Sequence, residues 1–144
     1  MSDTARVRAR RRRGARLLVA VAAGGALGTW ARDETVLALP VAAGGFPWAI
    51  FWVNVAGSFI LGVTMTLVLE RLPPTRYVRP VVAIGFCGGL TTFSTWMVDM
   101  VTLADRGHTG TAVLDLAVSL VAGLASLVAG VWATRLLIRE GSRP

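Results

Sequence analysis

The 144-residue chain has little of what most enzymes and metal centres rely on. It has one cysteine, Cys87, which excludes an intramolecular disulfide, and one histidine, His108. No cluster of histidine, cysteine and carboxylate residues resembles a zinc site, and the sequence has no phosphate-binding loop or Ser/His/acid set. Charged residues make up only 16% of the chain, and all 15 basic residues are arginines. These absences predict a protein that is not an enzyme.

Apolar residues are abundant instead. They make up 54% of the chain, and the mean hydropathy of +0.63 is too high for an ordinary soluble domain of this size. Four apolar segments, at 17–39, 48–69, 81–103 and 116–138, each approach the ~20 residues that a helix needs to cross a bilayer. The short alternating segments of a membrane barrel are missing. The sequence therefore predicts an all-α integral membrane protein with four transmembrane helices.

The arginines gather on one side of this predicted bundle. Four spans put the N-terminus, the loop at 71–80 and the C-terminus on the same side of the membrane. That side carries thirteen arginines, and the other side has two, Arg32 and Arg106. The thirteen are Arg6, Arg8, Arg10, Arg11, Arg12, Arg13, Arg16, Arg71, Arg76, Arg79, Arg135, Arg139 and Arg143. By the positive-inside rule, both termini are expected in the cytoplasm, with the chain in the cell (inner or plasma) membrane.

The domain organisation follows from these segments. We expect a flexible, arginine-rich cytoplasmic segment at 1–16, a membrane domain at 17–138 and a short tail at 139–144. Clustered arginines could bind nucleic acid, but beside a membrane span they more often set orientation and contact anionic lipid, which is the interpretation we favour. A twin-arginine or secretory signal is a weaker alternative, because three further spans would remain after its removal.

Polar and small residues interrupt the apolar spans. Asn54 lies in an uncharged span, where an unpaired carboxamide is costly, so it either joins two helices or donates in a permeation path. Arg32 ends the first span and could be functional, or it could reach the interface and pair with a neighbouring acid. In the fourth span Ser119, Gly123, Ser126 and Gly130 share one helical face. That face serves either close helix packing or a polar track of hydroxyl groups.

The third span contains an unusual segment, GFCGGLTTFSTW, at residues 85–96. Two adjacent glycines weaken a helix, and the four hydroxyl side chains that follow can satisfy backbone groups freed by a break. A broken membrane helix exposes carbonyls that coordinate a cation and N–H groups that attract an anion. The ring edge of Phe93 carries partial positive charge as well. The segment therefore predicts a third helix broken near its centre, with a donor set that favours an anion.

Three motifs resemble those of the Fluc/CrcB fluoride channels, which are small four-helix proteins of microbial inner membranes. The motifs are GGALGTWAR at 24–32, VNVAGSFILG at 53–62 and GFCGGLTTFST at 85–95. The resemblance implies an ion channel that passively exports cytoplasmic fluoride and so confers fluoride resistance. It also implies an antiparallel dimer with two fluoride pores and a buried structural sodium ion at the subunit interface.

The same resemblance implies roles for single residues. Gly88 and Thr91 would offer backbone carbonyls to the sodium ion. Phe93 would present its ring edge to fluoride, and Asn54 would support that site. The remaining implied residues are polar neighbours along the path, Ser94, Thr95 and Ser119, together with Arg32, which matches the family's arginine at the end of the first helix.

Two positions depart from the family's pattern. Trp96 stands where the family usually has a second phenylalanine, and its larger, N–H-bearing ring would line or narrow the fluoride path differently. Asp115 stands where the family commonly has a tyrosine, four residues before the serine of the fourth helix. A carboxylate beside an anion path would repel the ion. We favour a capping role for Asp115 at the start of the fourth helix, where the helix dipole stabilises an acid.

The arginine asymmetry raises a question about the dimer. An antiparallel homodimer needs one sequence to insert both ways, which calls for little arginine bias between its two sides. We therefore hypothesise that this chain pairs with an oppositely oriented homologue in a heterodimer. The alternative is a homodimer that tolerates the arginine-rich segment.

Two other functions are weaker alternatives. A small multidrug-resistance-type transporter needs a carboxylate in its first helix, and residues 17–31 contain none. The hydroxyl-rich segment of the third span argues against a membrane scaffold that uses its glycines only for packing, although Trp96 and Asp115 keep that alternative open for this subunit.

Overall fold

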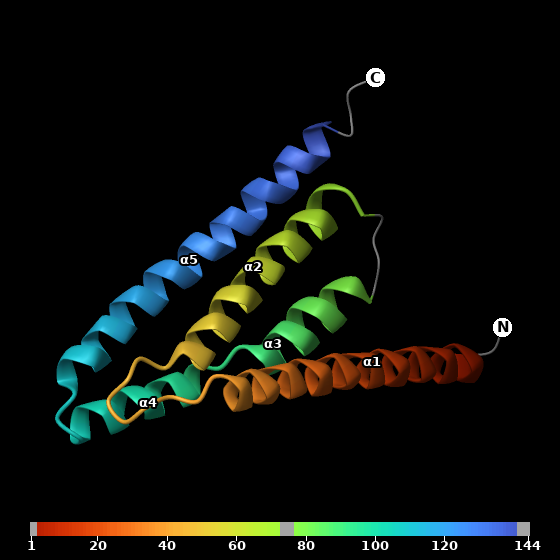
Figure 1. The fold of residues 1–144 in the computed structure, drawn as a ribbon. Coiled ribbons are helices and arrows are strands. Elements are labelled where there is room, and N and C mark those ends of the chain that lie inside the picture. Colours follow the sequence, from red (N-terminus) through yellow and green to blue (C-terminus); the bar gives the residue numbers. More distant parts are fainter. Residues whose placement is uncertain (1–2, 73–76, 141–144) are drawn as a thin grey trace.

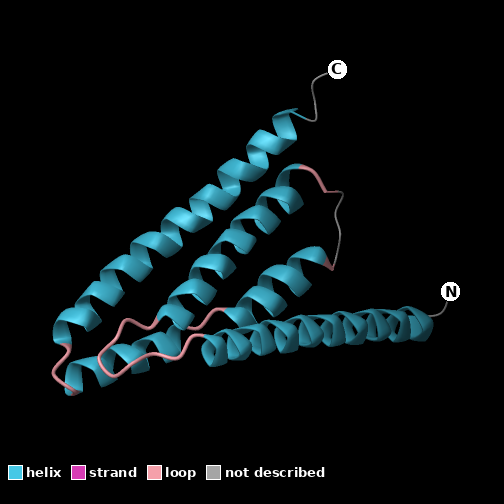
Figure 2. Cartoon of the chain, viewed as in Figure 1, coloured by secondary structure: helices cyan, strands magenta, loops and turns pink. Residues whose placement is uncertain are grey.

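The computed structural model describes residues 3–72 and 77–140, which form helices joined by short loops (Figure 1). The elements are α1 (Asp3–Ala38), α2 (Trp48–Glu70), η1 (Arg79–Phe86), α3 (Cys87–Leu90), α4 (Phe93–Asp105) and α5 (Thr109–Glu140). This described part contains no strand (Figure 2). Because η1, α3 and α4 together make the third span, the described residues contain four spans long and apolar enough to cross a membrane. The prediction of an all-α, four-span membrane protein is confirmed.

Two helices extend beyond the apolar segments predicted for them. α5 begins at Thr109 rather than near residue 116, because helical hydrogen bonding continues through polar residues that hydropathy does not mark. α1 begins at Asp3, so the segment at 1–16 is helical from that residue, and its flexibility stays a prediction. With 36 residues at 1.5 Å each, α1 is about 54 Å long and exceeds the ~30 Å hydrocarbon core. Arg76, Arg143 and the rest of the tail at 141–144 lie outside the described residues.

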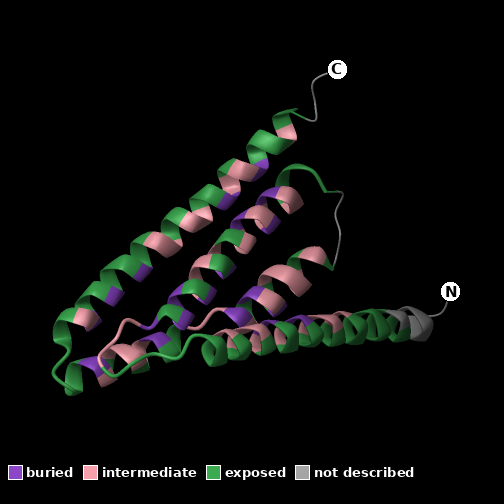
Figure 3. Cartoon of the chain, in the orientation of Figure 1, coloured by how far each residue is buried: buried purple, intermediate pink, exposed green. Residues whose placement is uncertain are grey.

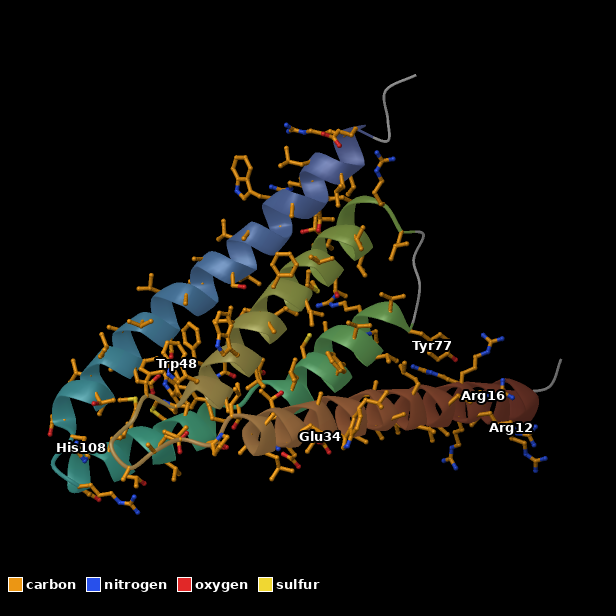
Figure 4. The ribbon with its side chains drawn as sticks, viewed as in Figure 1. Arg12, Arg16, Glu34, Trp48, Tyr77 and His108 are labelled. Carbon is orange, nitrogen blue, oxygen red and sulfur yellow. The ribbon has the colours of Figure 1, made fainter. Side chains whose placement is uncertain are left out.

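The arginine-rich ends of the elements lie at one end of the molecule. The N-terminal end of α1, the C-terminal ends of α2 and α5 and the start of η1 all lie there (Figure 1). Arg12 and Arg16 mark this end, whereas His108 marks the other (Figure 4). This arrangement is the one that four antiparallel spans require.

The helices pack as two pairs through small residues. α2 lies along α5, and α1 lies along η1 and α3 (Figure 1). A Cβ atom on Gly62 or Gly130 would collide with the backbone of the partner helix, and one on Gly89 would collide with the backbone of Gly25 in α1. These contacts support the close-packing interpretation for these glycines. Gly88 is different, because a Cβ atom there would meet nothing within 4 Å.

Polar contacts add to the pairing of α2 with α5. Ser126 of α5 donates a hydrogen bond of 2.8 Å to the carbonyl of Val55, so its hydroxyl joins two helices. At the arginine-rich end, Arg135 pairs with Glu70 at 2.7 Å. Buried residues lie where the helices face each other, and exposed residues cover the outer faces (Figure 3). Many of these exposed residues are large and apolar. The exposed apolar faces suit contact with lipid.

Candidate functional site

The third span is interrupted by two extended residues. α3 ends at Leu90, Thr91 and Thr92 have ψ angles of 152° and 124°, and α4 begins at Phe93. The interruption therefore follows the Gly88–Gly89 pair, which itself lies inside α3. Gly89 permits close packing against α1, and Gly88 faces open space. The change of backbone direction occurs at Thr91 and Thr92.

Asn54 of α2 holds the interruption in place. Its Nδ2 atom donates to the carbonyl of Thr92 at 3.2 Å, and the Thr92 N–H donates to its Oδ1 atom at 2.9 Å. Both backbone groups of one extended residue are thus satisfied by a single carboxamide. In a continuous helix the Thr92 N–H would bond to the carbonyl of Gly88, so that carbonyl loses its helical donor. Asn54 therefore acts as an interhelical contact that also frees a backbone oxygen.

Thr92 also begins the next helix. Its Oγ1 atom accepts a hydrogen bond of 3.2 Å from the Thr95 N–H, which is the contact of a helix N-cap. The hydroxyl groups of Thr92 and Thr95 lie 3.0 Å apart and are hydrogen-bonded. The N-terminal end of α4, with its partial positive charge, thus starts at Phe93. Thr92 was not among the predicted site residues, although a threonine directly before an apolar helical run is a recognisable N-cap signal.

A cavity of about 400 Å³ lies beside the interruption, between α2, η1, α3, α4 and α5. Six of the predicted site residues line it, namely Asn54, Gly88, Thr91, Phe93, Trp96 and Ser119. Three do not: Ser94, Arg32 and Thr95. Thr95 instead lines a second cavity of about 340 Å³ near the loop that joins α1 to α2. Arg32 lies near the end of α1, where its Nε atom is 3.4 Å from a carboxylate oxygen of Asp33.

The two aromatic residues of the site differ in their surroundings. The side chain of Phe93 projects from the chain and is 70% exposed, whereas Trp96 is buried. Their rings meet edge to face, with centroids 5.9 Å apart and planes at 81°. Phe93 thus presents an open ring beside the N-terminal end of α4.

Asp115 is not a helix cap, so the capping prediction is wrong. α5 begins at Thr109, which places Asp115 in the second helical turn, and its exposed fraction is 0%. Its Oδ2 atom accepts a hydrogen bond of 2.8 Å from Trp96 Nε1, and its Oδ1 atom accepts one of 2.7 Å from Ser119 Oγ. The two positions that depart from the family's pattern are therefore bonded to each other.

Comparison with known proteins gives concordant matches. The profile of the family described as "CrcB-like protein, Camphor Resistance (CrcB)" matches residues 19–131. A Streptomyces avermitilis protein named fluoride-specific ion channel FluC 3 is 47% identical over 136 residues, which cover 94% of this chain and 66% of that protein. A Mycobacterium bovis protein named fluoride-specific ion channel FluC 1 is 46% identical over 127 residues, covering 87% and 96%. The chain thus spans just under two thirds of the first relative and nearly all of the second.

Proposed function

The chain belongs to the CrcB-like family of membrane proteins, and we propose that it is a fluoride-selective channel that exports cytoplasmic fluoride passively. The observation that carries this proposal is the convergence of Asn54, Thr91, Phe93 and Ser119 on one cavity beside an interrupted span. The relatives are named as ion channels, which agrees with the expectation that the chain is not an enzyme.

The cavity offers an anion several weak donors without a fixed positive charge. The N-terminal end of α4 carries partial positive charge, and the edge of the Phe93 ring adds more. No arginine is among the residues that line the cavity. Fluoride is small and strongly hydrated, so it needs several donors to replace its water. We place its path along Phe93 and Asn54, with Ser94 and Thr95 as polar neighbours near the start of α4.

The interruption also suits a sodium ion. Sodium prefers oxygen ligands, and the carbonyl of Gly88 has lost its helical donor because the Thr92 N–H bonds to Asn54. Thr91 is extended, so its carbonyl leaves the helical direction as well. These two carbonyls would hold the ion, and its charge would offset their converging dipoles. One chain would supply only these two carbonyl ligands, which fits a sodium site completed at a subunit interface.

A second subunit would cover the open side of the cavity. Phe93 is largely exposed, and Gly88 has open space where a side chain would be. Both features suit a partner that approaches this face in an antiparallel dimer. The excess of arginine at one end of the chain favours a homologue of opposite orientation as that partner, and a homodimer is the alternative.

Fluoride efflux from liposomes that contain the purified chain tests the proposal. We expect efflux, measured with a fluoride electrode, that far exceeds chloride efflux. The variant Phe93→Leu keeps an apolar side chain but removes the ring edge, and it should slow fluoride efflux strongly. Equal efflux of both anions from folded protein would contradict a selective channel. Efflux that appears only after an opposite-facing homologue is added would establish the heterodimer.

A C-terminal tag tests the orientation claim directly. Labelling of the tag from each side of the cell membrane should find it in the cytoplasm alone. A substantial outward-facing fraction would contradict insertion in one orientation and favour the homodimer.

A further inference from the structure

Asp115 is a buried carboxylate that bridges the two helices on one side of the candidate path. It has the lowest exposed fraction of any large side chain in the described part of the structure. Its two oxygens bond to donors from different helices, Trp96 Nε1 of α4 at 2.8 Å and Ser119 Oγ of α5 at 2.7 Å. Trp96 and Ser119 line the 400 Å³ cavity, whereas Asp115 is not among the lining residues.

The two donors are of the kind that an anion in the cavity would use. An indole N–H and a hydroxyl can each donate one hydrogen bond, and both bonds are directed to the same carboxylate. Charge-assisted hydrogen bonds of this kind are stronger than those between neutral groups. Among the described residues, no buried side-chain nitrogen or oxygen lacks a partner, and both of these donors are bonded to Asp115. An ion that needed them would have to displace Asp115.

We propose that Asp115 is a built-in anion that occupies the donor pair formed by Trp96 and Ser119, and so excludes fluoride from that part of the cavity. This inference rests on the proposed function of the chain. Fluoride must then rely on the start of α4 and on the ring edge of Phe93. Asp115 thereby becomes a residue that limits fluoride passage through this subunit.

A purely structural role for the bridge is the competing explanation. Under that explanation Asp115 only fastens α4 to α5, and its replacement would loosen the protein without creating an anion site. Asp115→Asn separates the two explanations. Asparagine has the same shape and carries one acceptor oxygen in place of two, so at least one of the two donors becomes available to an ion.

The first test observes the donor itself. In protein labelled with ¹⁵N-tryptophan, the Trp96 indole N–H signal is identified as the signal that disappears in Trp96→Phe. Titration with sodium fluoride should shift this signal little in the unaltered chain and should shift it strongly and saturably in Asp115→Ala, which frees both donors, whereas sodium chloride should shift it in neither. A shift in the unaltered chain as large as that in Asp115→Ala would overturn the proposal, as would the absence of a shift in folded Asp115→Ala.

The second test measures transport. At an effective dielectric constant of about 20, repulsion between unit charges several ångströms apart corresponds to more than about a tenfold effect, so a gain of at least about tenfold in fluoride efflux is expected for Asp115→Asn. Asp99→Asn is the matched control, because Asp99 lies in α4 and lines the other cavity. An equal gain in both variants would show a general effect of charge and would overturn the proposal.

The two tests separate failure of the inference from failure of the proposed function. If no variant conducts fluoride but only Asp115→Ala shows the indole shift, the inference holds and the channel assignment fails. If the unaltered chain conducts fluoride, its efflux does not respond to Asp115→Asn and its indole signal does not respond to Asp115→Ala, the channel assignment holds and the inference fails.

Discussion

Replacing Asn54 with alanine should release the interruption of the third span. The variant loses both hydrogen bonds to Thr92, the 3.2 Å bond to the carbonyl and the 2.9 Å bond from the N–H. Interhelical hydrogen bonds in membrane proteins contribute roughly 0.6 to 1.7 kcal/mol each. The free energy of unfolding should therefore fall by about 1–3 kcal/mol. Because the Thr92 N–H is then free to return to the Gly88 carbonyl, α3 could also extend past its present end.

Thermal unfolding in detergent measures the first effect. At about 3 °C per kcal/mol for a chain of this size, the Tm of Asn54→Ala should fall by roughly 3–9 °C. Ser126→Ala is the matched control. It removes one side-chain hydrogen bond, from Ser126 of α5 to the carbonyl of Val55, which is the neighbour of Asn54 in α2, and it leaves the interruption intact. Its Tm should fall by no more than half as much, and its fluoride efflux should remain close to that of the unaltered chain.

The variant Asn54→Asp refines the test. An aspartate can still accept from the Thr92 N–H, but it cannot donate to the Thr92 carbonyl, and its charge would repel fluoride. We expect a smaller loss of Tm than for Asn54→Ala and a complete loss of efflux. If Asn54→Ala unfolded at the temperature of the unaltered chain and still conducted fluoride, the role that we assign to the carboxamide would be refuted.

Three further substitutions have clear expected outcomes. Thr92→Val removes the N-cap of α4 and should lower the free energy of unfolding by about 1 kcal/mol, visible as a lower Tm. Trp96→Phe leaves one buried oxygen of Asp115 without its donor and should cost about 1–3 kcal/mol, measured in the same way. Gly89→Ala should abolish the folded peak in gel filtration, because its Cβ atom would collide with the backbone of α1, whereas Gly88→Ala should retain the folded chain.

Matched controls distinguish these effects from a general sensitivity to substitution. Thr102→Val removes a hydroxyl that bonds only within its own helix, to the carbonyl of Val98, and should change the Tm little. Trp132→Phe alters an indole that is 63% exposed and should be close to neutral. A fall in Tm for these controls as large as for Thr92→Val or Trp96→Phe would contradict the assigned roles.

The four-span fold was predictable from the sequence, and the course of the third span was predictable only in part. Apolar length alone identifies each crossing, because a helix is the simplest way to satisfy the backbone in lipid. The glycine pair drew attention to the right segment, yet the extended residues are Thr91 and Thr92. The reason is that Asn54, 38 residues earlier, supplies the hydrogen bonds that make the extended conformation of Thr92 favourable. The local sequence preferences of residues 85–96 cannot predict a hydrogen bond to a residue so far away in the chain.

The role of Asp115 shows a different limit of sequence reasoning. The apolar segment predicted for the fourth helix begins at residue 116, so Asp115 was expected to lie at the start of that helix and to cap it. The helix begins at Thr109, and this shift moves Asp115 from a solvent-facing end into a buried turn opposite Trp96. Both Trp96 and Asp115 depart from the family's pattern in the sequence. Only the packing of α4 on α5 shows that the two side chains are hydrogen-bonded to each other.

Under the proposed function, one interruption would provide for two ions of opposite charge. Asn54 withdraws the Thr92 N–H from the Gly88 carbonyl, and this leaves a carbonyl oxygen at the C-terminal end of α3. The side chain of Thr92 then caps α4, whose N-terminal end carries partial positive charge next to Phe93. In this proposal, Asn54 and Thr92 together make both the acceptor for a cation and the donors for an anion. It follows that sodium dependence and fluoride conduction should be lost together when Asn54 is replaced, whereas a change confined to the Phe93 ring should affect conduction alone.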